Sequence, residues 1–151
     1  MGMESPTVPQ IPDLAIVAET IRLADLAEAE RYDQRPQEWP EYRVADVKEV
    51  FRPRPARDAL VSFLRNQSEE TVAGLYSLYR LGDPPRPSPA VALECYRCSY
   101  ELAIQPIHSE HGADDLAAKA PLAEGLRRGM ALLGLAILGL AIEPPPLGPT
   151  A

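Results

Sequence analysis

The sequence predicts an all-α protein: a compact orthogonal or bundle-like arrangement of about five to six helices with proline-rich connectors. Apolar residues recur at three- and four-residue spacings, which place side chains on one face of a helix. Alternation of the kind that marks a β-strand appears nowhere over a usable length. The chain also holds 17 prolines in 151 residues. Since proline lacks the N–H that a helix ladder needs, these residues are expected to separate the helices.

The clearest helical pattern is a pair of short helices between residues 56 and 82. Their apolar positions lie three or four residues apart. The apolar face of the first helix consists of Leu60, Phe63 and Leu64, and that of the second consists of Val72, Leu75, Tyr76 and Tyr79. Ser68 is placed to cap the second helix, and Gly82 is placed to end it in a left-handed conformation. The two helices are expected to fold back on each other and to organise the core.

The N-terminal part is expected to hold an extended leader, a long helix and a connecting segment. Residues 1–12 form the leader, and a helix follows over residues 13–32 with Asp13 as its cap. Its apolar stripe is expected to consist of Leu14, Ile16, Val17, Ile21, Leu23, Ala24 and Leu26. Between the two helical regions the sequence predicts a short helix over residues 41–51, and Trp39 is expected to anchor this segment on the core.

After the central pair, a proline-rich connector over residues 83–89 leads into a helix over residues 90–105. The apolar stripe of this helix is expected to face the core and consists of Val91, Cys95, Cys98 and Leu102. Pro106 is expected to end the helix. A short helix is predicted from Ala113, and Pro121 suits the first turn of the last helix.

The last helix contains no polar side chain over residues 129–142. A helix over this segment is only about 21 Å long, whereas the hydrocarbon core of a bilayer is about 30 Å thick and needs roughly 20 residues. We therefore expect a core helix that the rest of the chain encloses, with a partner-facing helix or membrane insertion as alternatives. Gly134 and Gly139 are expected where neighbouring backbones approach closely. One domain is predicted over residues 13–143, followed by a flexible proline-rich tail over residues 144–151.

Composition limits the classes of partner. The net charge of −7 argues against nucleic acid, because phosphate binding needs a surplus of Lys and Arg on one face. A local basic excess is interpreted as a solvated face rather than a site for an acidic partner. It consists of Arg43, Lys48, Arg52, Arg54, Arg57 and Arg65. Two cysteines do not make a secreted disulfide framework, and the N-terminus lacks the regions of a signal peptide, so a cytoplasmic location is expected.

The cysteines and histidines of the chain all lie within residues 95–111. The arrangement is Cys95-x2-Cys98-x9-His108-x2-His111. Zinc accepts two thiolates and two imidazoles, so these four residues are a possible metal site. The spacing fits no common zinc module, and a cysteine on an apolar stripe usually behaves as a small buried hydrophobic residue. We therefore predict core cysteines with surface histidines, and keep zinc as the alternative.

The order of the segments resembles an uncharacterised bacterial family of short all-helical proteins of unknown function. Three segments carry the resemblance: IPDLAIVAETIRLADLAEAERYD, ARDALVSFLRNQSEETVAGLYSLYRLGD and ADDLAAKAPLAEGLRRGMALLGL. It covers about residues 11–135. The resemblance implies an all-helical fold and implies no activity.

The sequence contains no catalytic signature. It has no G-x-S-x-G elbow, no phosphate-cradling glycine loop and no H-E-x-x-H motif. We therefore predict no catalytic or cofactor-binding residues. The first functional hypothesis is a small non-enzymatic cytoplasmic helical protein that acts through protein–protein interaction or self-association. The alternative is a small zinc-binding structural or regulatory protein that uses Cys95, Cys98, His108 and His111.

Overall fold

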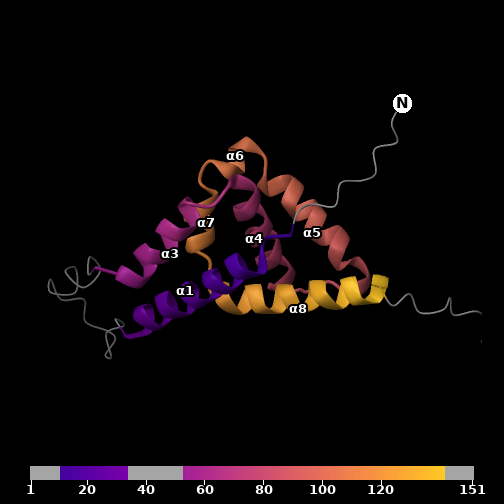
Figure 1. Ribbon diagram of the computed structural model, residues 1–151, viewed down its shortest axis with the longest axis horizontal. Coiled ribbons are helices and arrows are strands. Elements are labelled where there is room, and N and C mark those ends of the chain that lie inside the picture. The colour runs from indigo at the N-terminus through magenta and orange to yellow at the C-terminus, as the bar shows by residue number, and fades with distance from the viewer. Residues whose placement is uncertain (1–10, 34–52, 142–151) are drawn as a thin grey trace, which may run out of the picture.

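The computed structural model describes residues 11–33 and 53–141, with side-chain surroundings given up to residue 137. In this part of the chain all regular structure is helical, which confirms the all-α fold class (Figure 1). The helices are α1 (Leu14–Asp33), α3 (Pro55–Arg65), α4 (Glu69–Gly82), α5 (Pro89–Ala103), α6 (Pro106–Ser109), α7 (Gly112–Ala117) and α8 (Leu122–Ala141). The predicted helix over residues 41–51, Trp39 and the predicted tail over residues 144–151 lie outside the described residues.

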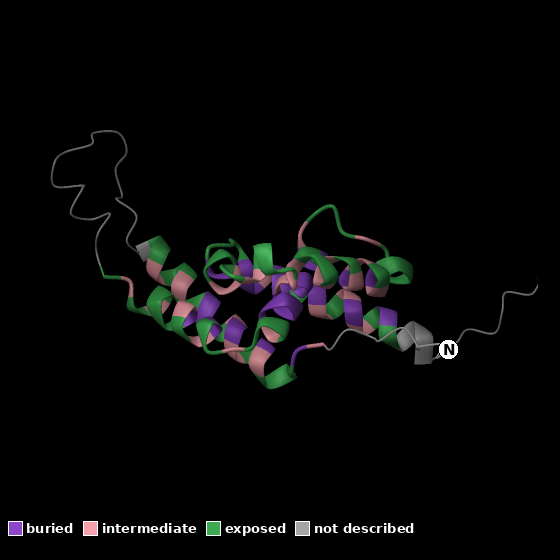
Figure 2. Ribbon diagram, turned by 90° about the horizontal axis from the view of Figure 1, so that it is seen from above, coloured by how far each residue is buried: buried purple, intermediate pink, exposed green. Residues whose placement is uncertain are grey.

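Helix α4 lies at the centre of the fold. It packs against α8, α5 and α7, while α1 contacts both α3 and α8 (Figure 1). Most residues of α4 are buried, except on the face of Glu69, Tyr76 and Arg80, and Figure 2 shows the buried positions gathered in the middle of the molecule. The buried residues of α4 are Val72, Ala73, Gly74, Leu75, Ser77, Leu78, Tyr79, Leu81 and Gly82. The second helix of the predicted central pair is therefore the core helix of the protein.

The first helix of that pair, α3, does not fold back on α4. It buries Leu60 and Leu64 and packs mainly on α1 and α7. The expectation of a paired hairpin is therefore wrong, although the buried faces of both helices were predicted. The short turn at residues 66–68 only redirects the chain, and each helix finds its packing partners elsewhere in the sequence.

Two helix caps follow the prediction. The Asp13 carboxylate accepts a hydrogen bond of 3.0 Å from the backbone N–H of Ala15, at the start of α1. The Ser68 hydroxyl accepts one of 3.1 Å from the backbone N–H of Thr71, at the start of α4. Each cap satisfies an N–H that has no partner inside its own helix.

We expect Ser68→Ala to lower the free energy of unfolding by about 1 kcal/mol, because it removes this cap from the central helix. Ser88→Ala is the matched control, since Ser88 occupies the same position before α5 but makes no side-chain cap hydrogen bond. Urea denaturation of the two variants measures the difference. Equal losses in both would mean that the Ser68 hydrogen bond contributes no net stability.

The end of α4 differs from the prediction. No described glycine has a positive φ, and Asp83, which follows Gly82, is extended, so Gly82 is not a left-handed stop. A Cβ added at Gly82 would overlap with the backbone carbonyl of Gly125 in α8. A Cβ at Gly129 would overlap with the carbonyl oxygen of Leu78 in α4. These glycines therefore allow the backbones of α4 and α8 to cross in direct contact.

Helix α8 buries one face and exposes the other. Leu122, Leu126 and Leu133 are almost fully buried, but Leu135 is 56% exposed and Ile137 is 43% exposed. The expectation that the chain encloses this helix on all sides is therefore wrong for those two side chains. A Cβ at Gly134 would meet nothing within 4 Å, so the close approach expected there is also wrong. None of the described helices combines the length and the apolar character that crossing a membrane requires.

Helix α5 is rotated from the predicted orientation. Its buried residues are Ala92 and Tyr96, whereas Val91 is 48% and Leu102 is 64% exposed. The buried stripe lies one residue further along the helix than expected. A small side chain at residue 92 permits close packing, and a tyrosine at residue 96 fills a large internal volume.

Candidate functional site

A groove of about 580 Å³ lies between α4, α5, α6 and α7. One face of α4 lines it, because residues three and four apart in a helix point in the same direction. That face contributes Glu69, Val72, Ala73, Tyr76 and Arg80. The last turns of α5 form the opposite wall with Ser99, Leu102 and Ala103.

The groove has an apolar floor and a charged rim. Leu64, Val72 and Ala73 are buried beneath it. The charged side chains at the rim carry both signs and consist of Arg65, Arg80, Lys119, Glu69, Glu110 and Asp115. Such a surface suits an amphipathic ligand, because apolar groups can be desolvated on the floor while polar groups reach the rim.

An ion pair between α3 and α7 borders the groove. The Arg65 guanidinium donates two hydrogen bonds to the Asp114 carboxylate, from Nε to Oδ1 at 2.8 Å and from NH2 to Oδ2 at 3.0 Å. This hydrogen-bonded arginine lowers the pKa of Asp114 and keeps the carboxylate ionised. Both side chains are largely exposed. The ion pair therefore orients α7 on α3 and adds little to the free energy of unfolding.

Two large apolar side chains stand exposed at one edge of the groove. Leu102 of α5 lines the groove and is 64% exposed, and Ile107 of α6, next to the groove residue His108, is 82% exposed. Isolated exposed apolar residues are common, so the side chain that matters for the groove is Leu102, which lies on its wall.

The structure places the four residues of the zinc alternative on α5, on α6 and at the residue before α7. Cys95 is half-buried against the core, Cys98 is exposed with its thiol 3.9 Å from a Glu94 carboxylate oxygen, and both are free. His108 is exposed in α6, and His111 is exposed just before α7. In the described residues, no three His, Cys, Asp or Glu side chains are grouped so as to hold a metal ion.

These positions also revise the packing interpretation of the cysteines. The expectation of surface histidines is confirmed, and Cys95 does pack against the core. Cys98 is not a core residue. Because α5 buries the stripe of Ala92 and Tyr96, Cys98 lies on the outer side of the helix.

We expect metal analysis of protein purified without a histidine tag to find far less than one zinc ion per chain. Changing Cys95 or His108 to Ala should leave the metal content at that low level. Stoichiometric zinc that disappears in either variant, together with lower stability, would instead support the zinc alternative, since a structural zinc contributes directly to folding.

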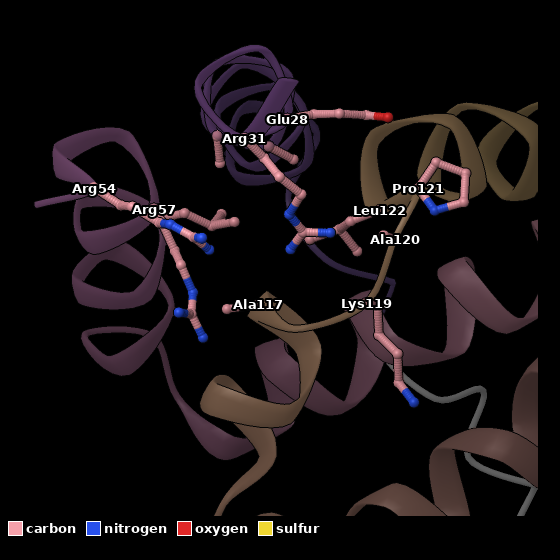
Figure 3. A pocket seen from close by; sticks show the side chains of 12 residues that line it. Glu28, Arg31, Arg54, Arg57, Ala117, Lys119, Ala120, Pro121 and Leu122 are labelled. Carbon is pink, nitrogen blue, oxygen red and sulfur yellow. The ribbon is translucent and has the colours of Figure 1, made fainter. Parts of the chain in front are cut away.

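A second, smaller cavity lies between α1, α3 and the segment that joins α7 to α8. Arginines from two helical regions surround it (Figure 3). Arg54 and Arg57 belong to the basic stretch that the sequence suggested was a solvated face. Arg31, from α1, adds a third guanidinium that the sequence pattern did not connect with them.

Comparisons of this chain with family models, curated proteins and solved structures gave no match. The resemblance to a bacterial helical family therefore stays a prediction.

Proposed function

We propose that this protein is a non-enzymatic helical interaction protein whose groove receives an amphipathic segment of a partner protein. The observation that carries the proposal is the groove of about 580 Å³, with a buried apolar floor and the exposed Leu102 on its wall. Docking of an amphipathic helix into an apolar groove is a common mode of recognition between proteins.

The charges of the rim support the same proposal. Arg80 and Lys119 are available to acidic residues of a bound segment, and Glu69 and Glu110 to basic ones. Charges of both signs at the edge fix orientation and register, while the apolar floor supplies most of the binding free energy. The bound segment is therefore expected to have apolar residues at three- and four-residue spacings between charged ones.

A cytoplasmic location in a bacterial cell belongs to the same proposal. The two cysteines are free, which is compatible with a reducing compartment. Bacterial origin rests only on the resemblance described above.

The experiment begins with helical peptides selected from a random library on the immobilised protein. Their affinities are then measured by fluorescence polarisation for the parent protein and for Leu102→Glu, which places a charge on the groove wall. Burying a leucine contributes about 1.5 to 3 kcal/mol, so we expect affinity to fall about tenfold or more.

Leu135→Glu is the matched control, because Leu135 is also exposed but lies on α8, away from the groove. It should change peptide affinity by less than about twofold, because its side chain does not touch a peptide bound in the groove. Peptides that bind Leu102→Glu as well as the parent protein would contradict the proposal. Loss of binding, or of self-association, only in Leu135→Glu would place the interaction surface on α8.

A further inference from the structure

Three arginines converge on the cavity between α1 and α3. Arg31 comes from α1, and Arg54 and Arg57 come from the start of α3. Figure 3 shows their guanidinium groups extending into the space between the two helices, whereas the ammonium of Lys119, which also lines the cavity, points away from it. The cavity itself is small, about 30 Å³, and is partly open to solvent.

The described carboxylates near these arginines form no ion pair with them. The Glu28 side chain points away from the guanidinium groups in Figure 3, and it helps to raise the pKa of Arg127. The Glu30 carboxylate accepts hydrogen bonds from the backbone N–H groups of Ala56 and Arg57, at 2.9 and 3.3 Å.

Asp114 is close enough to Arg57 for the arginine to lower its pKa slightly, but the carboxylate is held bidentately by Arg65. Within the described residues, Arg31, Arg54 and Arg57 form no ion pair. Among the described residues, three cations therefore share one cavity, and the carboxylate that also lines it, Glu28, points away from them. Like charges that share a cavity repel one another, and a bound anion would offset that repulsion.

We propose that this cavity binds a small phosphate-type oxyanion. Guanidinium groups match the geometry of phosphate oxygens and donate paired hydrogen bonds to them. Apart from Glu28 and Lys119, the remaining wall is apolar and consists of Ala24, Ala27, Leu60, Ala117, Ala120, Pro121 and Leu122. Arg31 and Arg57 are exposed and Arg54 is half-buried, so the apolar wall reduces solvent screening mainly on the inner side of a bound anion.

The size of the cavity limits the ligand. A volume of about 30 Å³ has no room for a nucleobase or a large cofactor, so the binding determinant is the oxyanion itself. The site is separate from the groove of the proposed function, although Lys119 borders both. Binding would join α1 to the start of α3 and thereby stabilise the packing of those two helices.

The test is titration of the full chain with inorganic phosphate at constant ionic strength, with chloride as the balancing anion. Isothermal calorimetry measures the affinity, and amide chemical shifts locate the site. We expect saturable binding with one phosphate per chain and shifts at the ends of α1 and α3. Hydrogen bonds to charged groups contribute about 1.5 to 3 kcal/mol, so Arg57→Gln should weaken binding about tenfold or more.

Two further variants complete the test. Arg31→Lys keeps the charge but loses the paired donors, so it should bind phosphate more weakly than the parent. It should also stay folded, and it therefore serves as the test if Arg57→Gln does not fold. Arg86→Gln is the matched control, because Arg86 is exposed and lies in the connector between α4 and α5, outside the cavity. It should bind phosphate as the parent does.

Three results would overturn the proposal. The first is an absence of saturable phosphate binding to the parent protein, and the second is equal affinity in Arg31→Lys and Arg86→Gln. The third is acetate binding as tightly as phosphate, which would make the site a carboxylate site. Because Arg57→Gln and Leu102→Glu alter different cavities, failure here leaves the result of the peptide experiment unaffected.

Discussion

Gly129→Ala should unfold at a clearly lower urea concentration than the parent protein. Alanine usually stabilises a helix by about 1 kcal/mol relative to glycine. Helix propensity alone would therefore predict a gain in stability, and we expect a loss. The reason is the crossing of α4 and α8, where a methyl group at residue 129 would overlap with the carbonyl oxygen of Leu78. Backbone atoms of a buried helix cannot move aside cheaply, and overpacking of this kind costs about 1 to 3 kcal/mol or more.

Gly134→Ala is the control, because it makes the same change in the same helix. A methyl group there meets nothing within 4 Å. We therefore expect a gain of about 1 kcal/mol from helix propensity. Gly82→Ala should behave like Gly129→Ala, since its methyl group would overlap with the carbonyl of Gly125. Stabilisation by all three alanines would show that α4 and α8 do not cross at these glycines.

The contrast between these glycines illustrates what sequence could predict about the fold. Because residues 129–142 have no polar side chain, the sequence predicted an enclosed helix there, with Gly134 where a neighbouring backbone approaches closely. The close approach is formed instead by Gly125 and Gly129, which lie four residues apart on one face of α8. That spacing is visible in the sequence. What the sequence does not contain is the identity of the opposing helix, because the contact partner, Gly82, lies more than forty residues away.

The caps and the buried faces of α3 and α4 were predictable because they depend on residues close together in sequence. Asp13 and Ser68 each satisfy an N–H group two or three residues away. The orientation of α5 was not predictable in this way. Its sequence has two stripes of similar apolar character, one with Cys98 and one with Ala92 and Tyr96. Which stripe is buried depends on the space between α5 and the helices α4 and α8 that it packs against.

The candidate sites were less predictable than the fold for the same reason. The cysteines and histidines are clustered in sequence, yet in the described part of the chain no three of them are grouped as metal ligands. The groove joins a face of α4 to the end of α5 and to α6 and α7, so it exists only in the folded chain. Arg31 is distant in sequence from Arg54 and Arg57, and only the packing of α1 on α3 places them around one cavity.

Leu75→Ala is expected to cause one of the largest losses of stability of any single truncation in the protein. Leu75 has no exposed surface and lies in the middle of α4, the central helix of the fold, most of whose residues are buried. Truncating such a leucine costs about 2 to 5 kcal/mol, since the lost apolar contacts are not recovered by collapse of the surrounding helices. Urea denaturation followed by circular dichroism measures the change.

Leu135→Ala is the appropriate comparison, because it makes the same truncation in a helix at a position that is 56% exposed. Surface substitutions of this kind change stability by about 0.5 kcal/mol or less. If Leu75→Ala is too unstable to fold, Leu75→Met keeps the volume and should lose less than about 1.5 kcal/mol. Similar losses at residues 75 and 135 would contradict a core centred on α4. They would be expected only if α8 is itself buried by a partner or a second copy, because a leucine at such an interface is as costly to truncate as one in a core.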